Sequence, residues 1–464
     1  MSGLDRLKKM TDELKTTNKG VYALIETLVD EKSFVECDRF IRSETELGVA
    51  VGEGVVSGFA PINGIGVNVF AVNGEVLKGG IGKRGADKIA KCAENAVKSG
   101  NPLVAIFDTS GARFAEGIEA LEGYGKIINA FSNAYGRVPV ISVVKGNNFG
   151  LSSYLCAVCD VCIGYEKSVT ASSSPLVISA KAGIDLNKVG TAAVHTKSTG
   201  LYALTVKADK DLKKAVGDIL DILVCDSAEP GDDLNRVAKS LKAGAKAEAV
   251  IKDLFDANTF INLRGEFAPA TVTGFARLGG QSVGVVATSD VLSADACVKI
   301  GELLNTCESF SLPVINIVDC NGTTLDAKEE NSSLIREAAN VMYLYSQLSV
   351  PKIALVTGKA IGAGYTAFCS KSFIDYTLAW PDAQIGALEA VKAAELIYSD
   401  EIAKSKKKDD AAKKLAASYA EENQSAAVVS AMGYIDNVIE PSFSRQYVIS
   451  ALQMLSKAGR SSCC

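Results

Sequence analysis

The sequence predicts an α/β fold in which two homologous domains follow one another along the chain. Two observations support this. Blocks of sequence in the first half recur in the same order in the second half, which indicates a duplication. Each half also contains short, continuous apolar runs, such as VISVV and KIALV, between stretches with helical spacing of apolar residues. Such runs are typical of parallel strands buried on both faces, so each half is predicted to be an α/β spiral.

The duplication is clearest where VPVISVVKGNNFGLSSYL, from Val138, matches VPKIALVTGKAIGAGYTA, from Val350, at an offset of 212 residues. Three further pairs occur in the same order: LVDEKSFVEC with LFDANTFINL, GFAPING with GFARLGG, and NPLVAIFDTSG with LPVINIVDCNG. We therefore place the two domains at residues 1–240 and 241–464. The polar stretch Ser227–Lys246 between them has a composition that suits a helical linker.

The chain begins with MSGLDRLKKMTDELK, which is charged and lacks the apolar core of a signal peptide, so we expect a cytoplasmic protein. Its most apolar window, Val55–Val72, is interrupted by glycine, proline and asparagine, which indicates two strands and a turn. With 48% hydrophobic and 22% charged residues, the composition is that of a globular protein. A formal net charge of -5 argues against nucleic acid or an anionic membrane as the main partner.

The same elements are predicted in order in each half. Paired strands at the GFA block precede an amphipathic helix, whose apolar residues recur from Ile89 to Val97 and from Ile300 to Cys307. A buried strand then ends near an aspartate, Asp108 or Asp319. A loop, a helix and a second buried strand follow, and that strand ends in glycine before a further helix.

The second buried strand of each half ends at a glycine, Gly150 or Gly362, and leads directly into a helix. The first amides of a helix have no intrahelical partner and carry partial positive charge, so this turn suits an oxyanion. Glycine also lets a ligand carbonyl approach the main chain, the arrangement that stabilises enolates and tetrahedral intermediates. The alternative is a tight turn that binds nothing. Two copies at equivalent places favour a pair of sites.

Several motifs together resemble one family. DTSGARFAEGIEAL, from Asp108, is similar to D-S-G-G-A-R-x-x-E-G-x-x-x-L, and GTAAVHTKSTG, from Gly190, to G-G-A-x-V-H-x-x-x-S-G. In the second half GFARLGG, YTLAWPDAQIGA and MGYIDNVIEPSFSR follow in the family's order. From about Leu28 to its C-terminal helix, the chain therefore resembles the biotin-dependent acyl-CoA carboxyltransferases of acetyl-CoA and propionyl-CoA carboxylases and of methylmalonyl-CoA and glutaconyl-CoA decarboxylases.

The resemblance implies two crotonase-like domains, the first on the acyl-CoA side and the second on the biotin side. It implies an enzyme that moves a carboxyl group between carboxybiotin and the α-carbon of a short acyl-CoA. In this family carboxybiotin releases CO2, the biotin oxyanion left behind takes the acyl α-proton, and the enolate attacks CO2. Both transient oxyanions need hydrogen-bond donors, which the two glycine turns would supply.

The family's motif positions carry over to named residues. The thioester oxygen would bind the amides of Gly150 and Leu151, and the ureido oxygen those of Ala363 and Gly364. The remaining implied contacts are Gly111, Ala112, Arg113 and Gly146 for acyl-CoA, Gly322, Gly362 and Tyr365 for biotin, and Thr366 in the acyl pocket.

Two of the motif side chains have alternative roles. Arg113 either steers the CoA phosphates or pairs with Glu116 one turn on. His195, the one histidine of the chain, stands at the family's V-H position, where packing or hydrogen bonding is the alternative to a direct catalytic role.

Three cysteines, Cys156, Cys159 and Cys162, lie close together in YLCAVCDVCIGY. A cluster-binding run would have a fourth cysteine nearby, and this apolar stretch suits small buried residues better. We expect no metal site.

The chain departs from the family where Leu151, Ala363 and Thr191 replace the second of two glycines. Main-chain donors survive these changes, but two alternatives stay open. One is another crotonase-type acyl-CoA enzyme, such as a hydratase, or a hydrolase that uses Ser152 or Ser153 with His195. The other is a catalytically silent scaffold subunit of a carboxylase complex.

The sequence contains no A-M-K-M biotinylation motif and no recognisable ATP-binding domain. The resemblance therefore implies separate partners: a biotin carboxyl carrier protein and a biotin carboxylase, or the subunits of a membrane decarboxylase. It also implies a homo-oligomer, a hexamer in the family, in which the first domain of one subunit faces the second domain of another.

Overall fold

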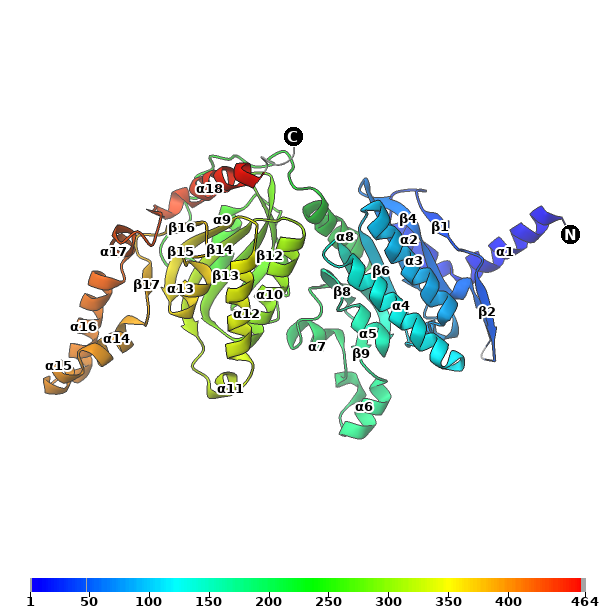
Figure 1. Ribbon diagram of the computed structural model, residues 1–464, viewed down its shortest axis with the longest axis horizontal. Coiled ribbons are helices and arrows are strands. Elements are labelled where there is room, and N and C mark those ends of the chain that lie inside the picture. Colours follow the sequence, from blue (N-terminus) through cyan, green and yellow to red (C-terminus); the bar gives the residue numbers. More distant parts are fainter. Residues whose placement is uncertain (1, 47, 460–464) are drawn as a thin grey trace. The chain divides into compact units, whose positions relative to one another are not determined.

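The computed structural model describes residues 2–46 and 48–459. Its chain divides into two compact units, Met1–Val224 and Cys225–Cys464, and each has its own hydrophobic core. In each unit helices pack on a twisted sheet of eight strands (Figure 1).

The sheet of the first unit has the order β1-β4-β5-β6-β7-β8-β10, and β9 pairs with the end of β7. β1, β4 and β5 are antiparallel neighbours, and the other pairs are parallel. The strands are β1 (Val35–Cys37), β4 (Val55–Ile62), β5 (Ile65–Val72), β6 (Leu103–Thr109), β7 (Val140–Phe149), β8 (Val161–Tyr165), β9 (Val169–Ala171) and β10 (Leu204–Val206), with β2 (Arg42–Thr45) and β3 (Gly48–Val51) as a separate pair. The helices are α1 (Gly3–Thr17), α2 (Lys19–Leu28), α3 (Lys83–Ser99), α4 (Ile118–Ala134), α5 (Leu151–Leu155), α6 (Pro175–Ala182), α7 (Ala192–Lys197) and α8 (Asp209–Val224).

The second unit repeats this topology as β11-β12-β13-β14-β15-β16-β18, with β17 on β15. Its strands are β11 (Ile261–Leu263), β12 (Thr271–Leu278), β13 (Gln281–Leu292), β14 (Val314–Thr323), β15 (Lys352–Ile361), β16 (Tyr376–Ala379), β17 (Gln384–Gly386) and β18 (Asn437–Val438). Its helices are α9 (Ala247–Leu254), α10 (Ala294–Ser309), α11 (Ala327–Glu330), α12 (Leu334–Gln347), α13 (Ala363–Phe368), α14 (Ala390–Ile397), α15 (Ser399–Lys404), α16 (Lys408–Asn423), α17 (Ala426–Ala431) and α18 (Ser444–Gly459). The two matching sheets confirm the predicted α/β duplication.

Two of the repeated blocks recur because together they close one hairpin. The carboxylate of Asp30 accepts the amides of residues 63–64, both at 2.9 Å. The carboxylate of Asp256 accepts those of residues 279–280, at 3.0 and 2.7 Å. An aspartate from the LVDEKSF or LFDANTF block therefore holds the turn that follows the GFA strand. This is a structural role, and it leaves the sites to other parts of the repeat.

The boundary between the units lies before the stretch where we predicted it. The helix expected between Ser227 and Lys246 is not formed, and the segment follows an irregular path on the second unit. The amide of Ala228 donates to Gly280 O (2.9 Å), and that of Ala238 donates to Ser442 O (2.8 Å). Main-chain hydrogen bonds thus join residues 225–240 to the second unit, which composition alone does not reveal.

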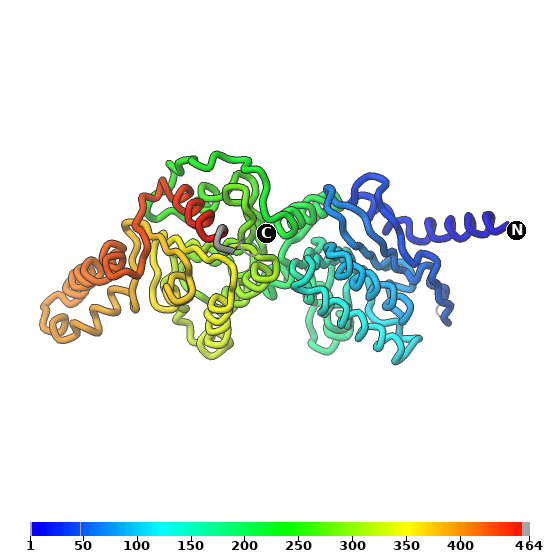
Figure 2. The backbone as a smooth tube through the Cα atoms, turned by 45° about the horizontal axis from the view of Figure 1, so that its top comes forward, coloured from blue at the N-terminus to red at the C-terminus, as the bar shows by residue number. Residues whose placement is uncertain are grey.

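In the second unit α14, α15 and α16 form an arm that leads away from the sheet, seen as the orange segment in Figure 2. Leu396 and Ile397 at the end of α14 are exposed. Among the described residues, no helix is long and apolar enough to span a membrane.

Candidate active site

In each unit a parallel strand ends at a glycine that has a positive φ angle. Gly150 follows β7 with φ +65°, and Gly362 follows β15 with φ +52°. Other residues rarely adopt these angles, so glycine is required at both turns. The amide of Gly150 donates to Ala171 O (3.0 Å), and the amide of Gly362 donates to Gly386 O (2.9 Å). Both turns are therefore fixed against the short strand that pairs with the end of the long one.

The next two amides of each turn are free to bind a ligand. They belong to Leu151 and Ser152 at the start of α5, and to Ala363 and Gly364 at the start of α13. Within residues 2–46 and 48–459, none of these four amides has a hydrogen-bond partner. The predicted donors Ala363 and Gly364 thus have free amides. In the first turn the amide of Gly150, one of the two predicted donors, is already used within the fold, and the free amides are those of Leu151 and Ser152.

Gly111 and Gly322 lie beside the two turns, as their assignment to the sites requires. Both have positive φ angles, +100° and +85°. A Cβ atom on Gly111 would stand 2.8 Å from Phe149 O, and one on Gly322 would stand 3.5 Å from Ile361 O. These two carbonyls come directly before the strand-end glycines. At Gly111 the short distance requires glycine for the loop to approach the turn, whereas at Gly322 the contact is an ordinary one and the positive φ angle favours glycine.

Gly146 and Gly358 have a packing role that the sequence did not show. A Cβ atom on Gly146 would stand 2.4 Å from Oδ1 of Asp108, and one on Gly358 would stand 2.3 Å from Oδ1 of Asp319. The same carboxylates accept the amides of the residues that follow the two glycines, at 2.9 and 2.8 Å. The aspartate and glycine thus recur together because one side chain stabilises the strand just before the turn.

Arg113 makes contacts inside the first unit. Its Nη1 lies 2.9 Å from Oε2 of Glu53 and 2.7 Å from Oε1 of Glu116, and the residue is 3% exposed. This geometry favours the ion pair with Glu116 over contact with CoA phosphates. Ala112 next to it forms an isolated bridge with Ile81, so this segment lies against the chain before α3.

Tyr365 and Thr366 both lie on the first turn of α13. Tyr365 is half-buried, and burial raises the pKa of its hydroxyl. Thr366 is exposed, and its Oγ1 donates to Gly362 O (3.2 Å). Their places beside the second turn are compatible with the predicted contacts to biotin and to the acyl group, which stay predictions.

His195 hydrogen bonds within the first unit and does not pair with a serine. Its Nε2 lies 2.8 Å from Thr170 O, and its Nδ1 lies 3.0 Å from Oγ1 of Thr199. Burial lowers its pKa, which favours the neutral ring. Ser152 donates its hydroxyl to Phe149 O and Ser153 donates to Gly150 O. The contacts favour a structural histidine over a Ser–His pair.

Of the three clustered cysteines, Cys156 and Cys159 follow α5 and Cys162 lies on β8. Cys156 and Cys162 are buried, and Cys159 is partly buried. Cys156 donates its thiol to Ser153 O at 3.1 Å, and Cys159 donates to Cys156 O at 3.0 Å. In the described part of the chain, no three His, Cys, Asp or Glu residues are arranged to hold a metal ion.

Two residues at the turns were not predicted from the sequence. Asn148, on β7, is fully buried, and in the described structure neither polar atom of its amide has a hydrogen-bond partner. Lys359, on β15, forms an ion pair with Glu389 beside the second turn. Both are polar residues within a strand that the sequence predicts to be buried, and this contrast could have identified them.

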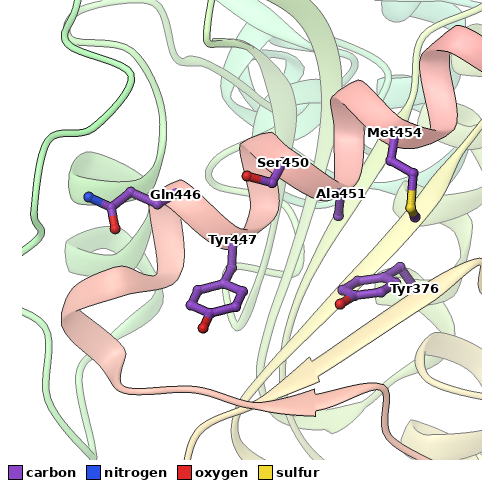
Figure 3. A pocket seen from close by; sticks show the side chains of 6 residues that line it. All are labelled: Tyr376, Gln446, Tyr447, Ser450, Ala451 and Met454. Atoms are coloured by element: carbon purple, nitrogen blue, oxygen red, sulfur yellow. The ribbon is translucent and has the colours of Figure 1, made fainter.

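Two cavities of the second unit lie away from the turn. One of about 430 Å³ lies between β16 and α18, where the ring of Tyr376 faces the helix (Figure 3). Another, of about 840 Å³, is lined by residues of the segment 232–272. Neither is lined by residues 358–366, so the candidate site is assigned from its free amides.

The chain is similar in sequence and structure to several known proteins. The family model for the carboxyl transferase domain matches residues 13–464. The alpha subunit of methylmalonyl-CoA decarboxylase from Veillonella parvula is 32% identical over 457 residues, which cover 92% of this chain and 88% of that protein. The 12S subunit of methylmalonyl-CoA carboxyltransferase from Propionibacterium freudenreichii subsp. shermanii is 31% identical over 482 residues, which cover 97% of this chain and 91% of that protein.

A solved structure shows the same fold. The transcarboxylase 12S crystal structure, described as a hexamer with methylmalonyl-coenzyme A and methylmalonic acid bound, superposes with a TM-score of 0.91 at 27% identity. The match covers 98% of this chain and 96% of that one. The fold is therefore that of the carboxyltransferases, with two crotonase-like domains. Because the family model covers nearly the whole sequence and relatives are more than 30% identical, the chain belongs to the carboxyl transferase domain family.

Proposed function

We propose that this chain is the carboxyltransferase subunit of a biotin-dependent acyl-CoA carboxylase or decarboxylase. It moves a carboxyl group between carboxybiotin and the α-carbon of a short acyl-CoA. The observation that carries the proposal is the pair of equivalent glycine turns, each with two free amides, in a chain that matches the family over residues 13–464. The reaction has two oxyanions to stabilise, and the chain has two such turns.

The first unit is the acyl-CoA side. Leu151 and Ser152 offer amides to the thioester oxygen, where negative charge develops as the α-carbon loses its proton. Each such donor is worth about 3 kcal/mol in the transition state. Gly111 keeps the turn accessible to the thioester, because a side chain at this position would contact Phe149 O beside the turn.

The second unit is the biotin side, and its residues fit a ureido group. Ala363 and Gly364 offer two amides to the ureido oxygen, and Gly322 and Gly362 keep side chains away from the turn. Gly364 must itself lack a side chain, because a Cβ atom there would stand 2.8 Å from Cys320. When bound, carboxybiotin supplies CO2 and the base for the acyl α-proton. The protein then needs no side-chain base of its own, which agrees with a structural role for His195.

Replacement of the family's second glycine does not remove the main-chain hydrogen-bond donors. Leu151 and Ala363 stand where the family has a second glycine, yet both contribute a free main-chain amide. This supports an active subunit over a silent scaffold. The hydrolase alternative is weakened by the hydrogen bonds of Ser152 and Ser153 to main-chain carbonyls.

The relatives are named as subunits, and the solved transcarboxylase is described as a hexamer around a multienzyme core. These names support a homo-oligomer, proposed to be a hexamer. They also support separate partners that carry and carboxylate biotin, or membrane decarboxylase subunits. A cytoplasmic location stays a prediction.

The test combines binding with turnover. The purified chain is titrated calorimetrically with acetyl-, propionyl-, crotonyl- and glutaconyl-CoA, and decarboxylation of malonyl- and methylmalonyl-CoA is followed with and without free biotin. Biotin-dependent turnover is expected. Turnover that is indifferent to biotin would support another crotonase-type enzyme, and absence of CoA binding would support the scaffold.

A further inference from the structure

The two glycine turns share a backbone but differ in charge at one position. The amide of Asn147 donates to Asp108 in the first unit (2.9 Å), and the amide of Lys359 donates to Asp319 in the second (2.8 Å). Both residues stand three positions before the strand-end glycine. The main chains are therefore held alike, while one turn carries a neutral side chain and the other a cation.

Lys359 has an acidic partner beside the turn. Its Nζ lies 3.1 Å from Oε1 of Glu389, the residue that immediately precedes α14. Gly386, three residues earlier, accepts the amide of Gly362. The ion pair therefore joins the two chain segments that meet at the second turn.

Among the described residues of the first unit, no such ion pair is formed at the matching place. Ala171 accepts the amide of Gly150 there, as Gly386 accepts that of Gly362. Ser174 precedes α6, where Glu389 precedes α14. Asn147 and Ser174 are both uncharged. A duplicated structure that keeps the backbone and changes the charge indicates that the two turns bind different ligands.

The ion pair is accessible and easily separated. The side chains of Lys359 and Glu389 are 37% and 32% exposed. Water and salt screen a pair with this exposure, so it contributes little to stability. The ammonium group can therefore exchange Glu389 for the carboxylate of a ligand in the turn without disturbing the fold.

We propose that Lys359 is a positioning residue for the carboxyl group in transfer. Its ammonium binds the carboxylate carried on the ureido nitrogen, and Glu389 holds the side chain in place when no ligand is bound. This inference rests on the proposed function, in which the second turn is the biotin side. A ureido oxygen needs only the two free amides, whereas an N-carboxylate needs a cation as well.

Two small probes separate this role from a structural one. (2-Oxoimidazolidin-1-yl)acetic acid carries a carboxylate near a ureido nitrogen, and 2-imidazolidinone lacks it. We expect the wild-type chain to bind the carboxylated probe more tightly in calorimetric titrations. Lys359→Met should lower the affinity for the carboxylated probe about 10-fold or more and leave the affinity for the neutral probe unchanged. Lys359→Arg should keep most of the preference for the carboxylated probe. Glu389→Gln should increase this preference, because it frees the ammonium group of Lys359.

Lys371→Met is the matched control. Lys371 forms an ion pair of similar exposure with Asp436, near the start of β16 and therefore at the other end of the sheet. This variant should bind both probes as the wild type does. Equal binding of the two probes by the wild type, or an unchanged preference in Lys359→Met, would overturn the inference. Absence of biotin-dependent decarboxylation by the wild type would instead refute the proposed function.

Discussion

At the scale of single residues, equivalent positions in the two units can have different charge states. Asp160 accepts the amide of Val140 (2.8 Å), and Asp375 accepts the amide of Lys352 (2.7 Å). The second carboxylate also pairs with Nζ of Lys352 at 3.4 Å. Asp160 has no cation beside it, and burial raises its pKa to about 7. The surroundings, and not the shared position in the repeat, thus set the charge of the residue.

Asp160→Asn is expected to stabilise the protein above neutral pH. Folding raises the pKa of Asp160. The contribution of this carboxyl group to the free energy of unfolding is therefore full below about pH 4 and is lost as the pH rises through about 7. Asparagine keeps an oxygen for the amide of Val140 and does not ionise. The free energy of unfolding of the variant, relative to wild type, should therefore rise between pH 4 and 7, by at most about 4 kcal/mol.

The measurement is denaturant unfolding at a series of pH values. Asp375→Asn is the control, because it leaves the buried Lys352 without its carboxylate and should destabilise the protein at neutral pH. A difference between Asp160→Asn and wild type that does not change with pH would contradict the predicted ionisation.

Asn148→Ala is expected to raise the free energy of unfolding by about 1 kcal/mol, because an unpaired buried amide costs about 1–3 kcal/mol. Asn148 lies opposite Thr109 in the sheet, and the matching residue of the second unit is Ala360, opposite Cys320. Alanine therefore fits this register. Thermal unfolding measures the change.

Asn316→Ala is the matched control for this variant. The Oδ1 atom of Asn316 accepts the hydroxyl of Tyr345 at 2.6 Å in a buried place. Its loss should destabilise the protein by about 1–3 kcal/mol. If Asn148→Ala were equally destabilising, Asn148 would have a partner, such as a bound water or a ligand.

At the scale of elements, the turn from strand to helix can be tested by removing single amides. Ala363→Pro removes one donor at the first position of α13, where proline is compatible with a helix. We expect biotin-dependent turnover to fall about 100-fold or more, with an unchanged circular dichroism spectrum. Ala363→Ser keeps the amide and should retain most of the activity. Turnover within threefold of wild type in the proline variant would exclude this amide as a donor.

Much of the order of elements was predictable from the sequence, because apolar periodicity and the repeated blocks both survive in the fold. The repeated blocks also located the glycine turns, whereas the family resemblance implied Ala363 and Gly364 as donors, a role that stays a prediction. The free amide pair of Leu151 and Ser152 was not predicted, since it depends on the hydrogen bond from Gly150 to Ala171 across two strands. Long-range contacts of this kind leave no local signal in a sequence.

Buried lysines show the same limit within helices. Lys88 and Lys299 stand at matching places in α3 and α10, one residue before the apolar runs from which these helices were predicted. Both are almost fully buried, and Lys299 donates to Phe267 O and Thr271 O at 2.9 and 2.7 Å. Periodicity would place a lysine on the solvent side, but these two satisfy main-chain carbonyls of a neighbouring segment.

At the scale of the whole molecule, duplication has produced two units with the same sheet and different polar cores. In each unit a buried arginine joins distant segments. In the first, Arg113 pairs with Glu53 and Glu116. In the second, Arg445 pairs with Asp256 at 2.6 Å and donates to Leu254 O at 2.7 Å. In the first unit Lys213, on α8, donates to Val29 O at 3.2 Å, much as Arg445 donates to Leu254 O. The carboxylate partners of Arg113 and of Arg445 lie within separate units, so the two ion pairs can be changed separately.

Arg445→Met and Arg113→Met should each destabilise one unit. Removing one partner of a buried ion pair costs about 3–5 kcal/mol, because the remaining carboxylate stays buried without a cation. Trp380 is the one tryptophan of the chain, and it lies buried in the second unit, where its Nε1 donates to Ser444, the residue before Arg445. Its fluorescence therefore follows the unfolding of the second unit, while circular dichroism follows both. We expect Arg445→Met to lower the fluorescence midpoint in urea, and Arg113→Met to leave that midpoint unchanged while it lowers part of the dichroism transition. If Arg113→Met moved the fluorescence of Trp380 as far as Arg445→Met does, the two units would unfold as one cooperative structure.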